Sequence, residues 1–207
     1  MFLFETARSF FSIRALLALM IFVNPAYGSN EYSLTILHGH GADHNLRELP
    51  ADIIAGNINW DDSYFSGISL ERDLGLLSIS SDTMPIRHGL ELIAIKHRGL
   101  QDNAEIGLAY KLKSPVWTFA KIETGFDFGM GISHASSDPN YEDGPLDDPT
   151  ARYKTQLLLL FDSRWRLKAN PRYSLLLRVH HRSGAYGAIA PRNVGSNFLS
   201  IGLGYDF

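Results

Sequence analysis

The sequence predicts an all-β fold: an eight-stranded antiparallel transmembrane β-barrel of the outer-membrane type. Three observations predict it. Apolar and polar residues alternate with a period of two over windows of about ten residues, short links alternate with long ones, and the chain ends on an aromatic residue, Phe207. Successive side chains of a membrane-spanning strand point in turn to lipid and to the lumen, so this rhythm is the expected pattern.

The first 28 residues read as a secretory signal peptide and not as a membrane anchor. Its parts are a basic region (Arg8, Arg14), an apolar region (15–23) and small residues at the two positions that a signal peptidase reads (Ala26, Gly28). The apolar region is too short to span a bilayer. We therefore expect cleavage before Ser29, with residues 29–207 forming a single β-barrel domain in the cell outer membrane.

Eight segments carry the alternation. They are residues 32–40, 63–73, 86–98, 104–112, 121–132, 153–167 and 175–183, and a last strand that ends at Phe207. The first three alternate less clearly than the others, and Leu158 and Leu160 interrupt the pattern of the sixth. Eight is an even number, as in bacterial single-chain barrels.

The lengths of the links support the same up-and-down order. Tight turns are expected at 113–115 and 169–171, and long outer loops at 41–62, 133–151 and 184–195. Two links fit less well, because 74–85 is long for the periplasmic side and the link after the third strand is short for an outer loop.

The polar face of the strands favours a barrel over a soluble β-sandwich. It is rich in Gly and Ser, whereas the polar face of a sandwich is heavily charged. Aromatic residues near the strand ends could form interfacial girdles: Tyr110, Trp117, Tyr153, Trp165, Tyr173 and Tyr205. The predicted lumen charges are Lys121, Glu123, Asp127, Asp162, Arg164 and Arg178. Eight strands leave no wide pore, so we expect these charges to form an ion-paired plug and not a porin channel.

Composition excludes several functional classes. The formal net charge of −3 gives no electrostatic argument for nucleic-acid binding. The chain has no Cys, which excludes disulfides, thiol catalysis, cysteine–metal sites and a lipoprotein anchor. No cofactor is expected.

The chemically most suggestive stretch is residues 178–187, Arg-Val-His-His-Arg-Ser-Gly-Ala-Tyr-Gly, followed by the final strand. By the alternation, His181 and Ser183 face lipid near the outer rim. Their Cα atoms are then roughly 6.5–7 Å apart, so suitable rotamers bring a histidine nitrogen within hydrogen-bond reach of the serine hydroxyl. Asn197 falls on the same face of the neighbouring strand and could orient the histidine.

This stretch resembles the lipid A 3-O-deacylase family, the PagL-like outer-membrane esterases (acyloxyacyl hydrolases), which carry a His-x-Ser motif on the penultimate strand. The resemblance covers about the last 35 residues. It implies serine-esterase hydrolysis of an ester-linked acyl chain of lipid A (lipopolysaccharide), with His181 as base and Ser183 as nucleophile. Ala185 matches the family, whereas Gly184 replaces its Asn and Asn197 stands where its acid is expected. We expect backbone N–H groups at Gly184 and Ala185 to hold the oxyanion.

Arg182 and Arg192 are the expected contacts for headgroup phosphates in the outer membrane bilayer.

A noncatalytic barrel with a structural or loop-binding role is the alternative, because His-x-Ser is a short motif. A homodimer is left open. A metal site at His38, His40, His44 and Asp43 is a further alternative. The acidic residues Glu142, Asp143, Asp147 and Asp148 are expected to form a solvated outer loop.

Overall fold

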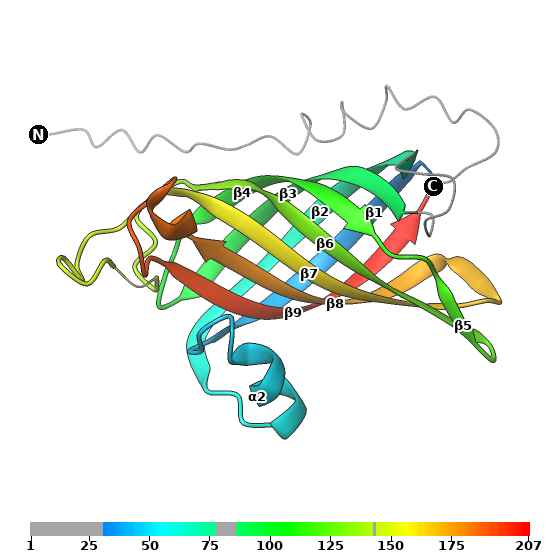
Figure 1. Cartoon of the computed structure of the whole chain (residues 1–207), viewed down its shortest axis with the longest axis horizontal. Helices are drawn as coiled ribbons and strands as arrows, with labels where there is room; N and C mark the ends of the chain where they lie inside the picture. Colours follow the sequence, from blue (N-terminus) through cyan, green and yellow to red (C-terminus); the bar gives the residue numbers. More distant parts are fainter. Residues whose placement is uncertain (1–30, 78–85, 143) are drawn as a thin grey trace, which may run out of the picture.

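The computed structural model describes residues 31–77, 86–142 and 144–207, and these residues form a closed antiparallel β-barrel (Figure 1). Within them, eight strands build the wall: β1 (Tyr32–Ala42), β2 (Trp60–Leu77), β3 (Ile86–Gly99), β4 (Ala104–Lys113), β6 (Ile122–Ala135), β7 (Thr155–Leu167), β8 (Asn170–Ser183) and β9 (Gly195–Asp206). Each pairs with the next along the chain, and β9 pairs with β1 to close the barrel. The predicted fold class is confirmed. The predicted signal peptide lies outside the described residues.

Two turns differ from the prediction at the barrel end that holds Tyr32 and Phe207. After β4, the chain forms the short strand β5 (Trp117–Phe119), which pairs with the start of β6, so the reversal comes at 120–121 and not at 113–115. Ala120 has a φ of 54° there. Asn170 and Pro171 belong to β8, so the β7–β8 turn consists of residues 168 and 169 alone.

Leu158 and Leu160 interrupt the alternation because they point into the barrel. Both are completely buried in an interior apolar cluster with residues such as Phe65, Ile93 and Phe198. A Cβ at Gly107 would come within 2.8 Å of Leu158, and one at Gly129 within 3.1 Å of Leu160. Glycines on β4 and β6 therefore make room for leucine in a narrow lumen.

A network of charged residues fills the rest of the interior. Arg178 donates to Asp162 at 2.7 Å and to Glu91 at 2.8 Å, and Lys111 donates to Asp162 at 2.7 Å. The predicted members Asp127, Asp162, Arg164 and Arg178 are confirmed as ion-paired. The prediction that Lys121 is a lumen charge is wrong, because Lys121 lies exposed in the β5–β6 turn. Glu123 makes no ion pair within the described residues. Glu71, Glu91 and Lys111 are further members.

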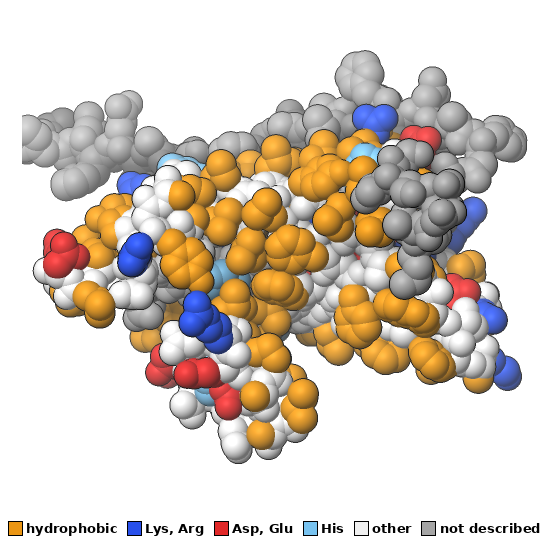
Figure 2. Space-filling view, viewed as in Figure 1, with side chains coloured by type: hydrophobic (Ala, Val, Ile, Leu, Met, Phe, Trp, Pro, Cys, Tyr) orange, Lys and Arg blue, Asp and Glu red, His pale blue; other side chains and the backbone are white. Residues whose placement is uncertain are grey.

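The outside of the barrel is covered by hydrophobic side chains (Figure 2). Residues such as Ile106, Leu108, Met130, Ile132 and Ile201 alternate along their strands with buried residues and are half exposed. Trp117, Trp165, Tyr173 and Tyr205 are also exposed, and the last two pack together with ring centroids 5.3 Å apart. The described residues contain no helix long and apolar enough to cross a membrane.

The loops at the opposite end carry two elements that the alternation did not predict. The link between β1 and β2, residues 43–59, contains helix α2 (Leu49–Ala55), which lies beside the barrel wall (Figure 1). We call this link the 43–59 segment. The link between β8 and β9 contains a single 3₁₀ turn, η1 (Ala185–Gly187). The turn η1 follows β8 directly, and the 43–59 segment contacts β9 and η1 through His44 and Arg47.

Candidate functional site

Strand β8 presents His181 and Ser183 on its outward face. Along this strand Leu176, Arg178, His180 and Arg182 are buried in the interior, and the residues between them face outward. His181 and Ser183 are half-buried. The period-two geometry of the strand thus places both side chains of the motif on one side of the wall, as the sequence predicted.

Asn197 lies directly opposite His181 on the neighbouring strand β9. The two side chains are hydrogen-bonded, with 2.8 Å between His181 Nδ1 and Asn197 Oδ1. Asn197 also donates from Nδ2 to the backbone carbonyl of His44 at 2.6 Å. The sequence prediction that Asn197 could orient His181 therefore agrees with the geometry.

The contact to His44 decides which way the Asn197 amide faces. Because Nδ2 donates to a carbonyl, Oδ1 is the atom that faces the histidine ring and must accept. His181 therefore carries its proton on Nδ1, and Nε2 keeps a lone pair. This is the tautomer that a general base requires, and it is the arrangement found in Cys-His-Asn enzymes.

Ser183 shares the face of His181 but is not joined to it. Among the described residues, the hydroxyl of Ser183 has one hydrogen-bond contact, in which Oγ accepts from the backbone N–H of Ala185 at 3.5 Å. His181 Nε2 and Ser183 Oγ are not hydrogen-bonded in this conformation. The hydrogen bond between nucleophile and base is often long in an enzyme without substrate and tightens only in the complex.

The two backbone N–H groups expected to form the oxyanion hole differ in whether they already have a partner within the loop. Gly184 donates its N–H to the carbonyl of Val194 at 3.1 Å, so this group cannot serve, and that prediction is corrected. The N–H of Ala185 points to Ser183 Oγ, so it lies beside the place where Oγ would attack an ester carbonyl and the oxyanion would form on the carbonyl oxygen. The loop also explains the glycine, because a Cβ at Gly184 would come within 2.1 Å of the carbonyl oxygen of Pro191.

Arg182 faces the interior, which contradicts its predicted contact with a headgroup. It is completely buried and donates from Nε to Ser133 Oγ at 2.9 Å, from Nη2 to the Lys154 carbonyl at 2.8 Å and from Nη1 to Glu142. Arg182 is one residue out of step with His181 and Ser183, so the pleat turns it inward. Arg192 is exposed in the β8–β9 loop and bonds to the Tyr186 carbonyl at 3.4 Å.

Glu142 is buried, which corrects the prediction that its acidic run is entirely solvated. It accepts from Arg182, from Gln156 and, at 3.4 Å, from Ser196 Oγ. Burial raises the pKa of the Glu142 carboxyl to about 7, against the lowering effect of the Arg182 guanidinium. Asp147 and Asp148 are exposed as expected, and Asp143 lies outside the described residues. The contacts of Glu142 with Arg182 and Ser196 attach the β6–β7 loop to β8 and β9.

The site depends on His44, which belongs with His38, His40 and Asp43 to the metal site that the sequence suggests. His44 Nδ1 lies 2.9 Å from Asp52 in α2, and Nε2 accepts from the Asn59 N–H at 2.8 Å. These contacts fix the carbonyl that holds Asn197. His38 and His40 instead contact Ser66 and the Asp61 carbonyl. No group of three metal-binding side chains occurs in the described parts of the chain.

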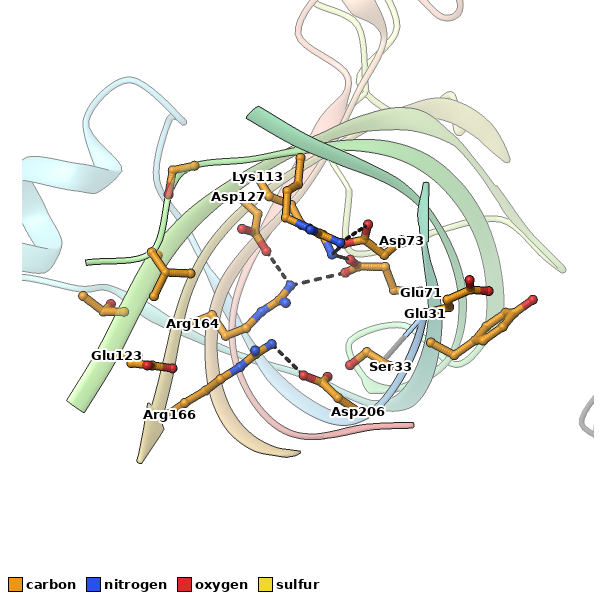
Figure 3. Close-up of a pocket in the computed structure, with 16 residues that line it drawn as sticks. Glu31, Ser33, Glu71, Asp73, Lys113, Glu123, Asp127, Arg164, Arg166 and Asp206 are labelled. Atoms are coloured by element: carbon orange, nitrogen blue, oxygen red, sulfur yellow. Dashed lines mark hydrogen bonds and ion pairs between the residues drawn. The ribbon is translucent and has the colours of Figure 1, made fainter. Parts of the chain in front are cut away.

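A cavity of about 190 Å³ opens at the opposite end of the barrel (Figure 3). Its walls are charged, and most of these charges pair with one another. Arg166 contacts Asp206 at 2.8 Å, Arg164 contacts Asp127 at 2.5 Å, and Lys113 contacts Asp73 at 3.1 Å. The cavity is therefore the end of the interior charge network, and it is far along the barrel from His181.

Comparisons with known proteins identify the fold. No protein-family profile and no curated protein sequence matches the chain. The crystal structure of the outer membrane enzyme PagL superposes with a TM-score of 0.56 at 11% identity, covering 84% of this chain and 99% of that one. The crystal structure of Neisserial surface protein A (NspA) gives 0.50 at 14% identity, covering 86% and 98%. The chain thus has the eight-stranded fold of these outer-membrane barrels.

Proposed function

We propose that this protein lies in the outer membrane of a Gram-negative cell and hydrolyses an ester-linked acyl chain of lipid A. The observation that carries the proposal is the hydrogen bond between His181 Nδ1 and Asn197 Oδ1, on the outward face of the wall beside Ser183. Polar side chains that face acyl chains are costly unless they are paired or serve a function. Here the pairing sets the tautomer in which Nε2 is the nitrogen that can act as a base.

The chemistry follows from this tautomer. His181 Nε2 takes the proton of Ser183 as Oγ attacks the ester carbonyl, and the N–H of Ala185 stabilises the oxyanion. His181 then gives the proton to the departing alcohol oxygen, which leaves an acyl group on Ser183. Water, deprotonated by His181, hydrolyses this ester and releases the fatty acid. Asn197 holds the ring throughout but supplies no negative charge to the imidazolium.

The place of the site on the barrel supports a lipid substrate. The outward-facing residues that follow Asn197 along β9 are Leu199, Ile201 and Leu203, so the site adjoins the hydrophobic belt. A lipid in the outer leaflet can reach Ser183 sideways, with its headgroup near the exposed Arg192. The similarity to PagL, described as an outer membrane enzyme, agrees with this proposal.

Mass spectrometry of lipid A tests it directly. The purified barrel in detergent micelles with lipid A should release a fatty acid, and Ser183→Ala should abolish that release. Ser163→Ala is the matched control, because Ser163 is also outward-facing and half-buried, on the adjacent strand β7. Undiminished release by Ser183→Ala, or no release by the unaltered protein, would overturn the hydrolase proposal.

A noncatalytic surface role is the second candidate. It is favoured by the missing hydrogen bond between His181 and Ser183 within the described residues and by the engagement of the Gly184 N–H with Val194. The similarity to a Neisserial surface protein agrees with it. Under this candidate, the outer loops would bind a partner and the lipid A experiment would give no product.

A further inference from the structure

We infer that the 43–59 segment contacts the membrane, with helix α2 placing Ile53 and Ile54 among the acyl chains of the outer leaflet. The inference rests on the membrane location proposed above and does not require hydrolysis. It assigns a lipid surface as the partner of an element that lies outside the barrel wall.

One face of helix α2 is buried against the protein and the other is exposed. Leu49 is 1% exposed, whereas Ile53 is 44% and Ile54 is 89% exposed. Pro50, Ile53 and Ile54 are spaced three and four residues apart, so they share one side of the helix. Two isoleucines on one exposed side, with charged residues elsewhere in the segment, are typical of an element at a membrane interface.

The position of the helix places this side at the level of the hydrophobic belt. Along the horizontal axis of Figure 1, α2 lies within the length of the strands and not beyond their loop end. In Figure 2, the acidic side chains of the segment gather on the side nearer the outer loops, and the hydrophobic ones gather on the opposite side. The segment therefore has its charged side toward the outer loops and its hydrophobic side toward the middle of the barrel, as expected for a barrel in a bilayer.

Three contacts fix the segment against the barrel in this orientation. The His44 carbonyl accepts from Asn197 at 2.6 Å, the His44 ring contacts Asp52 at 2.9 Å, and Arg47 Nη2 lies 3.5 Å from the Tyr186 hydroxyl. The first joins the segment to β9, the second joins its start to α2, and the third joins it to η1. Because the first contact also orients Asn197, the lipid-contacting helix and His181 belong to one connected unit.

Spin labelling tests the contact without an activity measurement. The chain has no Cys, so single-cysteine variants take one nitroxide label each. Ile54→Cys reports on the helix, Glu48→Cys on the polar part of the same segment, Leu203→Cys on the belt and Asp147→Cys on an outer loop. The variants are reconstituted in phosphatidylcholine vesicles, and the collisions of each label with oxygen and with a water-soluble nickel complex are measured.

We expect the oxygen-to-nickel ratio at position 54 to be several-fold higher than at 48 and 147, and to approach that at 203. A ratio at 54 equal to that at 147 overturns the inference. So does protection of position 54 accompanied by spin–spin broadening that disappears on dilution with unlabelled protein, because a second copy then covers the helix. A water-exposed label at 203 would refute the membrane location itself, whatever the result of the lipid A experiment.

Discussion

Strand β8 carries two kinds of polar residue, and their surroundings differ sharply. Arg178 faces the interior, is buried and donates to two carboxylates, Asp162 and Glu91. His181, three residues later, faces outward, is half-buried and makes one side-chain hydrogen bond, to Asn197. The charge of the interior group is matched by two carboxylates, whereas the exterior group has one side-chain partner, which is uncharged. The difference separates a residue that stabilises the barrel from one that is available for chemistry.

The physical reason lies in what surrounds each residue. A charge inside the narrow barrel has little water, so leaving it without partners is strongly unfavourable. A neutral imidazole at the rim has no such requirement and can keep an open acceptor at modest cost. Substitutions that exchange or remove these roles should therefore affect different quantities, the free energy of unfolding for the interior and the rate of hydrolysis for the exterior.

The largest effect is expected for Arg178→Met. Removing the guanidinium leaves Asp162 and Glu91 buried without their principal partner, which should lower the free energy of unfolding by about 3–5 kcal/mol. Urea unfolding in detergent micelles, followed by tryptophan fluorescence, measures it. Arg192→Met, at an exposed arginine, should change the midpoint little. Equal effects of the two substitutions would contradict the structural role of the network.

Leu158→Ala and Leu157→Ala compare the two faces of β7 at adjacent positions. Leu158 is fully buried in the lumen, so truncation leaves a cavity and should cost about 2–5 kcal/mol of unfolding free energy. Leu157 faces outward, where lipid or detergent fills the space. The cost at 158 should exceed the cost at 157 by roughly 1–2 kcal/mol, the cavity contribution. A larger loss at 157 in the same urea titration would mean that the faces are reversed.

Asn197→Ala addresses the exterior site. Without its orienting amide, His181 can adopt other rotamers and the opposite tautomer, so kcat for lipid A hydrolysis should fall on the order of 10²-fold, less than the ~10⁴-fold seen when a charged orienting acid is altered. KM should change little. Asn57→Ala, an exposed asparagine in the 43–59 segment, is the matched control. A kcat within twofold of the unaltered protein would remove Asn197 from the site.

A pH dependence of the free energy of unfolding is expected from Glu142. The pKa of its buried carboxyl is raised from its ordinary value near 4.5 to about 7. A raised carboxyl pKa means that the folded state binds the proton more tightly, so stability is greatest below about 4.5 and declines as the pH rises through about 7. Urea midpoints at pH 5 and pH 8 measure the decline. Glu142→Gln should reduce the difference, and an unchanged difference would assign it to other groups.

The sequence by itself determined the barrel, because the period of two is a local property that needs no knowledge of partners. It identified the eight strands of the wall, their even number and the outward face shared by His181, Ser183 and Asn197, but not the short strand β5. The alternation did not explain why some leucines of β7 face the interior while others face outward. Leu158 and Leu160 point inward with the pleat of β7, and glycines on β4 and β6 leave room for them there. Alternation alone carries no information about those other strands.

Only the tertiary structure decided which polar groups already have a hydrogen-bond partner. Arg182 donates a hydrogen bond to Glu142, the Gly184 N–H donates to the Val194 carbonyl, and Asn197 donates to the His44 carbonyl. The partners of Arg182 and Asn197 lie 40 and 153 positions away along the chain, and no local pattern records such a pairing. Helix α2 depends on the same contacts, since it is too short to be stable alone. A hydrogen bond is set by where two distant groups meet, and that is a property of the closed barrel.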